Sequence, residues 1–168
     1  MRMTTIAVPA LLWLVLAVSA PVHAGAQTEL DHIVARVNNR IITNTDVEHA
    51  RQLQLVADTA SDDATRRCLE DRILVLTEIA RVAPVAPAGD DELAERRSEW
   101  VARVGGSGRA AELLTAAGMS DPSLQQWFRD DVRIQSYLKR QFGAGPESDR
   151  AKAQADWIAR LRQRAGLR

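Results

Sequence analysis

A mainly helical domain with one short β-hairpin near its N-terminal end is the fold class that the sequence predicts. Residues 33–43, IVARVNNRIIT, place β-branched residues on either side of two asparagines, which is typical of a tight hairpin. From residue 45 onward, apolar residues recur at helical spacing in six stretches. Clusters of Gly, Pro, Ser and Asp separate these stretches and mark where helices begin and end.

The hairpin and the first helix are predicted from adjacent signals. Residues 33–37 and 40–43 are the two strands, and Asn38 and Asn39 can both take the positive φ of a two-residue turn. Two strands alone are marginally stable in water, so the hairpin must lie on another element. Thr45 and Glu48 have the spacing of a capping box that starts the first helix. The apolar side of that helix is expected to comprise Val47, Ala50, Leu53 and Ala57.

The next three helices follow from their periodicity and from the breaks between them. Residues 64–82 carry two apolar stripes, which predicts a central buried helix. The Pro-rich segment 83–89 ends it, and the Asp pair at 90–91 caps a third helix that extends to residue 104. Residues 105–108, GGSG, form a turn in which Ser107 caps a short fourth helix, and Gly118 is the expected stop.

Two longer helices complete the domain. Asp121 at the cap and Pro122 at the first helical position predict a fifth helix over residues 121–142. After a break at residues 143–149, the sixth helix is predicted over residues 149–165. The apolar stripe of this helix would be exposed to water if the helix stood alone. We therefore expect the helix to pack back on the domain and close it.

Composition and the N-terminus limit the functional classes. The 168 residues include 22 basic and 22 acidic side chains, and this balance gives no reason to expect a nucleic-acid partner. Residues 1–24 have the pattern of a signal peptide: Arg2, an apolar run at 6–18, and VHA before the cleavage point. We therefore expect a periplasmic protein, cleaved after Ala24 or after Ala26, that does not span the membrane. An uncleaved anchor is the alternative.

Reactive groups are sparse in the predicted mature chain. Its histidines are His32 and His49, and no metal-ligand, nucleophile-elbow or phosphate-loop motif is found. Cys68 is the only cysteine, so the fold must depend on its core, and we expect Cys68 to be a small buried apolar residue. The sequence thus predicts no catalytic residues, no metal ligands and no cofactor.

The stretch DHIVARVNNRIITNTDVEHA at residues 31–50 resembles the start of mature SurA-type periplasmic chaperones. Residues 67–82 are similar to the central helix of that family, and residues 110–138 are similar to its helical hairpin. The resemblance implies a domain over residues 25–145 like the SurA N-terminal domain, closed by a C-terminal helix over residues 146–168. It also implies that the hairpin packs with the C-terminus, where AGLR at 165–168 could add an edge segment.

The chain departs from that family in one respect. SurA-type proteins usually carry parvulin prolyl-isomerase domains between the fifth helix and the last one, but here only residues 143–152 separate them. The residues for isomerase activity are therefore missing at this position. The expectation is a non-enzymatic chaperone core.

The functional expectation is a chaperone-like protein that binds unfolded or exported polypeptides, including outer-membrane proteins awaiting assembly, in an apolar helical groove without ATP. A scaffold or assembly subunit with one fixed partner is the alternative, and a prolyl isomerase is a weaker one. Client identity and oligomeric state stay open. The candidate polypeptide-binding residues, for which ordinary core packing is the competing interpretation, are Trp100, Leu114, Met119, Trp127 and Phe128.

Overall fold

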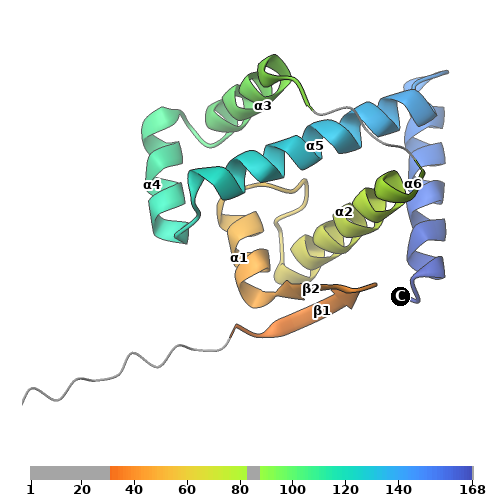
Figure 1. Ribbon diagram of the computed structural model, residues 1–168, viewed down its shortest axis with the longest axis horizontal. Helices are drawn as coiled ribbons and strands as arrows, with labels where there is room; N and C mark the ends of the chain where they lie inside the picture. Colours follow the sequence, from red (N-terminus) through yellow and green to blue (C-terminus); the bar gives the residue numbers. More distant parts are fainter. Residues whose placement is uncertain (1–30, 83–87, 168) are drawn as a thin grey trace, which may run out of the picture. The chain divides into compact units, whose positions relative to one another are not determined.

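The computed structural model describes residues 31–82 and 88–167, and in these ranges the chain forms six helices and one hairpin (Figure 1). The predicted fold class is confirmed: the protein is mainly helical, has an N-terminal hairpin and is closed by its last helix. The predicted signal peptide lies outside the described residues. The elements are β1 (Ile33–Val37), β2 (Arg40–Thr43), α1 (Asn44–Gln52), α2 (Asp62–Val82), α3 (Asp90–Arg103), α4 (Ser107–Ala117), α5 (Asp121–Phe142) and α6 (Glu147–Arg164).

Helix α2 is the centre of the domain, as its two apolar stripes predict. It packs against both strands and against α1, α5 and α6. One core cluster lies around α2, and a second joins the segment after α1 to α3, α4 and α5. Trp127 on α5 packs against both clusters, so it connects the two halves of the core.

The hairpin has the predicted strands and an antiparallel register in which Val37 faces Arg40 and Arg36 faces Ile41. Asn38 has a φ of 55°, but Asn39 does not share the positive φ that the sequence allowed. Val37 and Ile42 are buried against the core, so the alternation of side chains places Ile41 on the opposite face. Ile33 and Ile41 are accordingly about half exposed, at 53% and 47%.

Helix α1 starts two residues earlier than predicted. Thr43, not Thr45, is the cap: its hydroxyl accepts from the amide of Asp46, whose carboxylate accepts from the amide of Thr43. The helix ends at Gln52, so Ala57 lies outside it and is exposed. The following turn is fixed from α3, because the indole N–H of the buried Trp100 donates to the carbonyl of Leu53 at 2.7 Å.

The starts of α3, α4 and α5 differ slightly from the predictions. Gly89 precedes α3, and its amide donates to the carboxylate of Glu92, so the Asp pair lies in the first turn. Ser107 is the first residue of α4 rather than its cap. Ser120 caps α5, which moves Asp121 and Pro122 one position into the helix. These shifts leave the order of the helices unchanged.

Helix α6 packs on α2 and α5, while the hairpin packs on another part of α2. Leu161 of α6 belongs to the same core cluster as Val37 of β1, so the two ends of the described chain share one core through α2. The prediction that AGLR adds an edge segment is wrong for the described residues 165–167. The amide of Leu167 instead donates to the carbonyl of Arg162 in a helix-terminating turn, with Gly166 at a φ of 70°.

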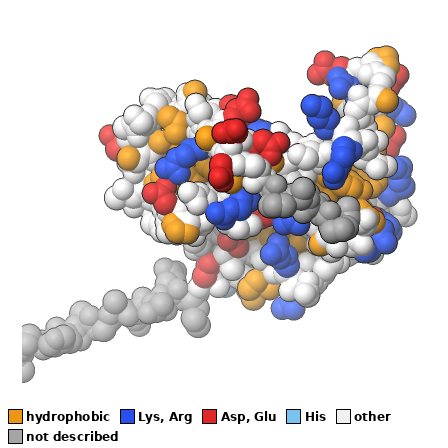
Figure 2. Space-filling model, turned by 45° about the horizontal axis from the view of Figure 1, so that its top comes forward, with side chains coloured by type: hydrophobic (Ala, Val, Ile, Leu, Met, Phe, Trp, Pro, Cys, Tyr) orange, Lys and Arg blue, Asp and Glu red, His pale blue; other side chains and the backbone are white. Residues whose placement is uncertain are grey.

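The surface mixes both signs of charge. Figure 2 shows Lys and Arg side chains interspersed with Asp and Glu side chains, with small hydrophobic areas between them. This agrees with the zero net charge of the sequence and leaves no extended field of one sign on the face shown.

Candidate functional site

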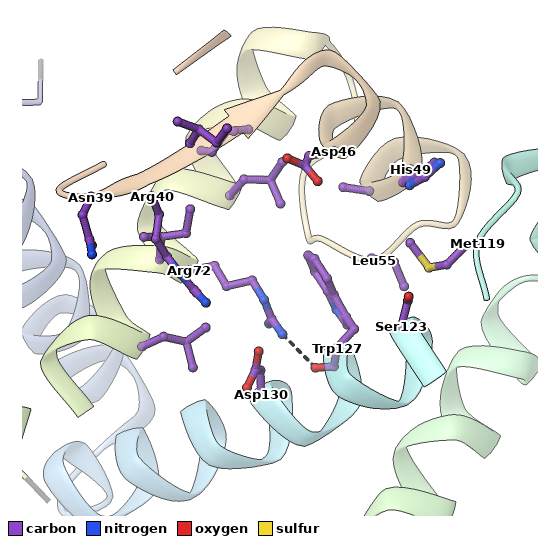
Figure 3. Close-up of a pocket in the computed structure, with 16 residues that line it drawn as sticks. Asn39, Arg40, Asp46, His49, Leu55, Arg72, Met119, Ser123, Trp127 and Asp130 are labelled. Atoms are coloured by element: carbon purple, nitrogen blue, oxygen red, sulfur yellow. Dashed lines mark hydrogen bonds between the residues drawn. The ribbon is translucent and has the colours of Figure 1, made fainter. Parts of the chain in front are cut away.

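A cavity of about 570 Å³ lies between the hairpin, α1, α2 and the first half of α5. Figure 3 shows side chains from all four elements converging on it. Its size is in the range of pockets that hold small ligands or a few side chains of a peptide. The residues that line it are Asn39, Arg40, Ile41, Ile42, Asp46, His49, Ala50, Leu55, Leu69, Arg72, Ile73, Leu76, Met119, Ser123, Trp127 and Asp130.

Much of the wall is apolar because two helices turn one face toward it. Leu69, Ile73 and Leu76 lie at helical spacing along α2 and form one side. Met119, just before α5, and Trp127, on its second turn, form the opposite side. Such a wall attracts apolar groups in proportion to the area they bury and with little directional preference.

Arg72 holds the Trp127 side of the cavity in place. Its guanidinium carbon lies 3.9 Å from the centroid of the Trp127 ring, which is the geometry of a cation–π contact. The same guanidinium pairs with the carboxylate of Asp131 and donates to the backbone carbonyl of Trp127 at 2.7 Å. Since Arg72 comes from α2 and the other two residues from α5, these contacts fix the distance between the two helices across the cavity.

The indole N–H of Trp127 is buried and has no hydrogen-bond partner among the described residues. A buried donor without a partner costs about 1–3 kcal/mol, so such groups are rare and call for an explanation. Trp127 therefore contributes to this wall a buried hydrogen-bond donor that has no partner among the described residues.

Besides Arg72, three charged residues line the cavity or its rim, Arg40, Asp46 and Asp130, together with His49. Asp46 is engaged in the capping box of α1. Asp130 accepts from the side-chain amide of Gln126 at 3.1 Å and lies 3.6 Å from Arg133. Both carboxylates thus have partners within the fold.

The structure separates the five predicted binding residues into three groups. Trp100 and Phe128 are buried in the second core cluster, at 0% and 2% exposure, with their rings 6.0 Å apart. Leu114 is half-buried and lines a smaller hollow of about 390 Å³ between α4 and α5. Met119 lines both that hollow and the main cavity, and Trp127 lines the main cavity. Their role in binding polypeptides stays a prediction.

Sequence reasoning missed the α2 side of the cavity. Ile73 and Leu76 belong to the apolar stripes that predict a buried α2, so they were assigned to the core. Arg72 is part of no recognised motif. The signal was nevertheless present, because a second apolar stripe on one helix indicates either a second layer of core or a lined cavity.

A second apolar cavity, of about 560 Å³, lies between α2, α5 and α6. Cys68 lines it and is half-buried, so the expectation of a fully buried cysteine was too strong. Across residues 31–82 and 88–167, no cluster of His, Cys, Asp and Glu is arranged to hold a metal ion. None of the helices in these ranges is long and apolar enough to cross a membrane.

No family model, no curated protein and no solved structure matches this chain. An assignment of function must therefore start from the cavity and its residues.

Proposed function

We propose that this protein is a periplasmic, chaperone-like protein that binds unfolded or exported polypeptides in the cavity beneath the hairpin, without ATP and without catalysis. The observation that carries the proposal is the apolar wall contributed by Ile73, Leu76, Met119 and Trp127. A wall of this kind offers roughly 25 cal/mol per Å² of apolar area removed from water, so it accepts many sequences. Weak sequence preference is what a chaperone for unfolded chains requires.

Two side chains on this wall suit an adaptable site. Met119 is unbranched and polarizable, so it can follow the shape of different occupants. Trp127 presents a large apolar ring to the cavity, where it can contact the apolar side chains of different occupants.

The resemblance to SurA-type chaperones supports the same proposal. The hairpin, the capped first helix and the central helix occur in the order that this family has, and the segment between α5 and α6 is too short to hold a parvulin domain. The periplasmic location rests on the predicted signal peptide. Mass spectrometry of the protein from its native compartment tests it, with Gly25 or Gln27 as the expected first residue.

The proposal is tested by filling the cavity. Ser123 is exposed and lines the cavity on α5, so Ser123→Trp should place an indole in it. Gln125→Trp is the matched control, because Gln125 is exposed on the same helix and lies outside the cavity lining. The wild-type protein should suppress aggregation of a denatured reporter enzyme diluted into buffer, Gln125→Trp should retain this activity, and Ser123→Trp should lose most of it.

Thermal melting of both variants shows whether the fold is kept. Suppression that is equal in both folded variants would exclude this cavity as the binding site. A protein that never suppresses aggregation, yet binds one partner from the envelope through the same cavity, would support the scaffold alternative.

A further inference from the structure

We infer that the segment bound in this cavity pairs an apolar side chain with an adjacent acidic side chain, whose carboxylate is held by Arg40. The inference rests on the proposed function and specifies its substrate class. It follows from the charges on the cavity wall, from the position of Arg40 on the hairpin, and from the acidic groups that limit how much negative charge the site can hold.

Arg40 is the arginine of the wall that lacks an internal partner. The other one, Arg72, has the carboxylate of Asp131 and the carbonyl of Trp127. Among the described residues, no hydrogen bond or ion pair reaches the guanidinium of Arg40, and its side chain is exposed at the cavity rim. A guanidinium offers five donors in a planar fork, which matches a carboxylate.

The hairpin register explains why Arg40 faces the cavity. Arg40 pairs with Val37, and directly opposed residues share one face of a sheet. Val37 is fully buried against the core, so Arg40 lies on the same inward face, at the end next to the turn. Figure 3 shows the side chains of Arg40 and Arg72 extending into the cavity from β2 and α2.

The two arginines of the wall are matched in number by two carboxylates, those of Asp46 and Asp130, but Asp46 is held in the capping box of α1 and Asp130 accepts from Gln126. A carboxylate of the bound segment would give the guanidinium of Arg40 the partner that it lacks within the described residues. The side chain next to it on the bound segment would then meet the wall formed by Ile73, Leu76 and Trp127.

The same wall argues against a highly charged ligand. Asp46 and Asp130 also line the cavity, and they would repel a phosphate chain or a run of acidic residues. One carboxylate next to an apolar group satisfies Arg40 and the apolar wall together. This is the chemistry of a single Asp or Glu inside an apolar stretch of polypeptide.

The test uses three short peptides with amidated C-termini that differ at one position. Each carries leucine and phenylalanine followed by glutamate, glutamine or lysine. The purified full chain should bind the glutamate peptide about fivefold more tightly than the glutamine peptide, and the lysine peptide most weakly. The preference for glutamate should shrink when the ionic strength is raised, because the pair is near the surface.

Charge reversal identifies the residue. Arg40→Glu should abolish the preference for glutamate and favour the lysine peptide instead. Arg36→Glu is the matched control: it changes the net charge equally, but Arg36 is exposed on β1 and lies outside the cavity lining. Arg36→Glu should leave the order of the three affinities unchanged.

The outcomes separate this inference from the proposed function. Equal binding of all three peptides would overturn the role of Arg40 and leave a purely apolar chaperone site. Binding of none of them would overturn both. If the glutamine peptide gains affinity only when its C-terminus is a free carboxylate, the site recognises chain ends, and the inference of an internal acidic side chain is wrong.

Discussion

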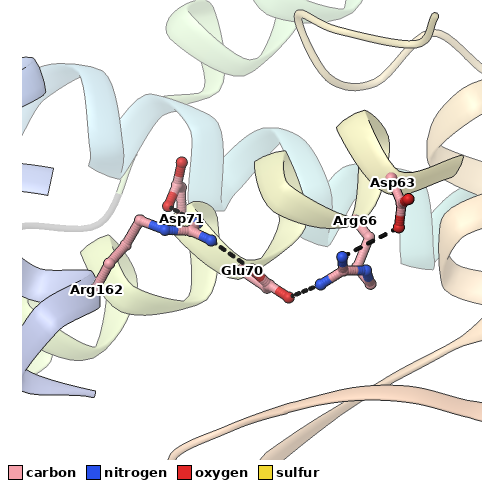
Figure 4. Close-up of polar contacts among 5 residues, drawn as sticks. All are labelled: Asp63, Arg66, Glu70, Asp71 and Arg162. Atoms are coloured by element: carbon pink, nitrogen blue, oxygen red, sulfur yellow. Dashed lines mark hydrogen bonds and ion pairs between the residues drawn. The ribbon is translucent and has the colours of Figure 1, made fainter. Parts of the chain in front are cut away.

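The guanidinium of Arg162 on α6 donates to the carboxylate of Glu70 on α2 at 2.9 Å, where the Glu70 side chain is only 3% exposed (Figure 4). The same guanidinium donates to Asp71 at 2.6 Å, and Arg66 pairs with the other oxygen of Glu70. Burial lowers the pKa of Arg162, but the hydrogen bonds to Asp71 and then Glu70 outweigh it, so this pKa is raised above its ordinary value. The charged cluster therefore joins α6 to α2 while it compensates a buried carboxylate.

Removing Arg162 should destabilise the fold more than its partial exposure suggests. Arg162→Met keeps the length of the side chain but leaves one oxygen of Glu70 buried without its partner. We expect a loss of about 3 kcal/mol in the free energy of unfolding, measured by chemical denaturation. Lys152→Met is the control, because Lys152 pairs with Asp156 on the surface of α6, and its loss should cost less than about 1 kcal/mol. Equal effects would show that the buried cluster does not hold α6.

A second ion pair between α2 and α6, in which Glu78 lies 3.6 Å from Arg164, should weaken in acid. Hydrogen bonds from Arg81, partly opposed by burial, and then the charge of Arg164 hold the pKa of Glu78 below its ordinary value of 4.5. The folded state therefore binds this proton less tightly than the unfolded state. The stabilisation by Glu78 is fully present above pH 4.5 and is lost as the pH falls through the lower folded-state pKa.

Melting temperatures as a function of pH test this link. At neutral pH the wild-type protein should melt above Glu78→Gln, and the difference should shrink steadily as the pH falls below 4.5. A difference that stays constant down to the acid end of the series would contradict the lowered pKa of Glu78.

Trp100→Phe should show how strongly α3 fixes the turn after α1. The substitution removes the donor to the carbonyl of Leu53 and leaves space in a core where Trp100 is fully buried. We expect a loss of about 2–4 kcal/mol in the free energy of unfolding. Trp157→Phe is the control, because Trp157 is half-buried and packs with a tilted ring against Tyr137 and Phe142, so a phenyl ring keeps much of its contact. A larger effect at Trp157 would contradict this interpretation.

The sequence predicts the hairpin and the number of helices well because their signals are local. Asn38 takes the positive φ expected at the turn, and Gly118 takes a φ of 64° where a stop was expected. The start of α1 was missed by two residues because Thr43 and Thr45 each have an acid three positions later. Which one caps the helix depends on where β2 ends, and the packing of the hairpin on α2 decides that.

The cavity could be predicted only in part because it depends on how helices cross. Trp127 and Phe128 are neighbours on α5, and periodicity alone cannot tell which one enters the core. The crossing of α2 and α5 places Phe128 inside and Trp127 at the cavity. The role of Arg72 in the cavity wall depends on its contacts with α5, and no local pattern in α2 predicts these contacts.

The proposed lack of catalysis gives a prediction of its own. In the family that the chain resembles, isomerase domains follow the fifth helix, but here α6 begins five residues after the end of α5, at Glu147 after Phe142. The purified protein should not speed up the isomerisation of a proline-containing test peptide. Without a catalyst this isomerisation takes on the order of tens to hundreds of seconds at 25 °C. A parvulin-type isomerase added to the same assay is the control. Clear turnover that survives repurification would contradict the proposal.

Helix α6 should be an integral part of the domain rather than an appendage. Leu161 is buried in the core cluster around α2, and the half-buried Trp157 and Ile158 pack against the same cluster. A chain that ends at Gly145 would expose this surface of α2 and would also leave Glu70 without Arg162. We expect such a chain to be unfolded or to melt far below the full-length protein.

A milder change tests the same interface in a chain that still folds. Trp157→Ala combined with Ile158→Ala should cost about 2–5 kcal/mol, a large share of the 5–15 kcal/mol that holds a typical domain together. Arg160→Ala combined with Gln163→Ala is the matched control, since both residues are exposed on α6 and should matter little. Denaturant unfolding of the two double variants measures the difference. If the chain without α6 melts cooperatively at the temperature of the full-length protein, α6 is an independent appendage and the closed chaperone-like domain proposed for this protein is wrong.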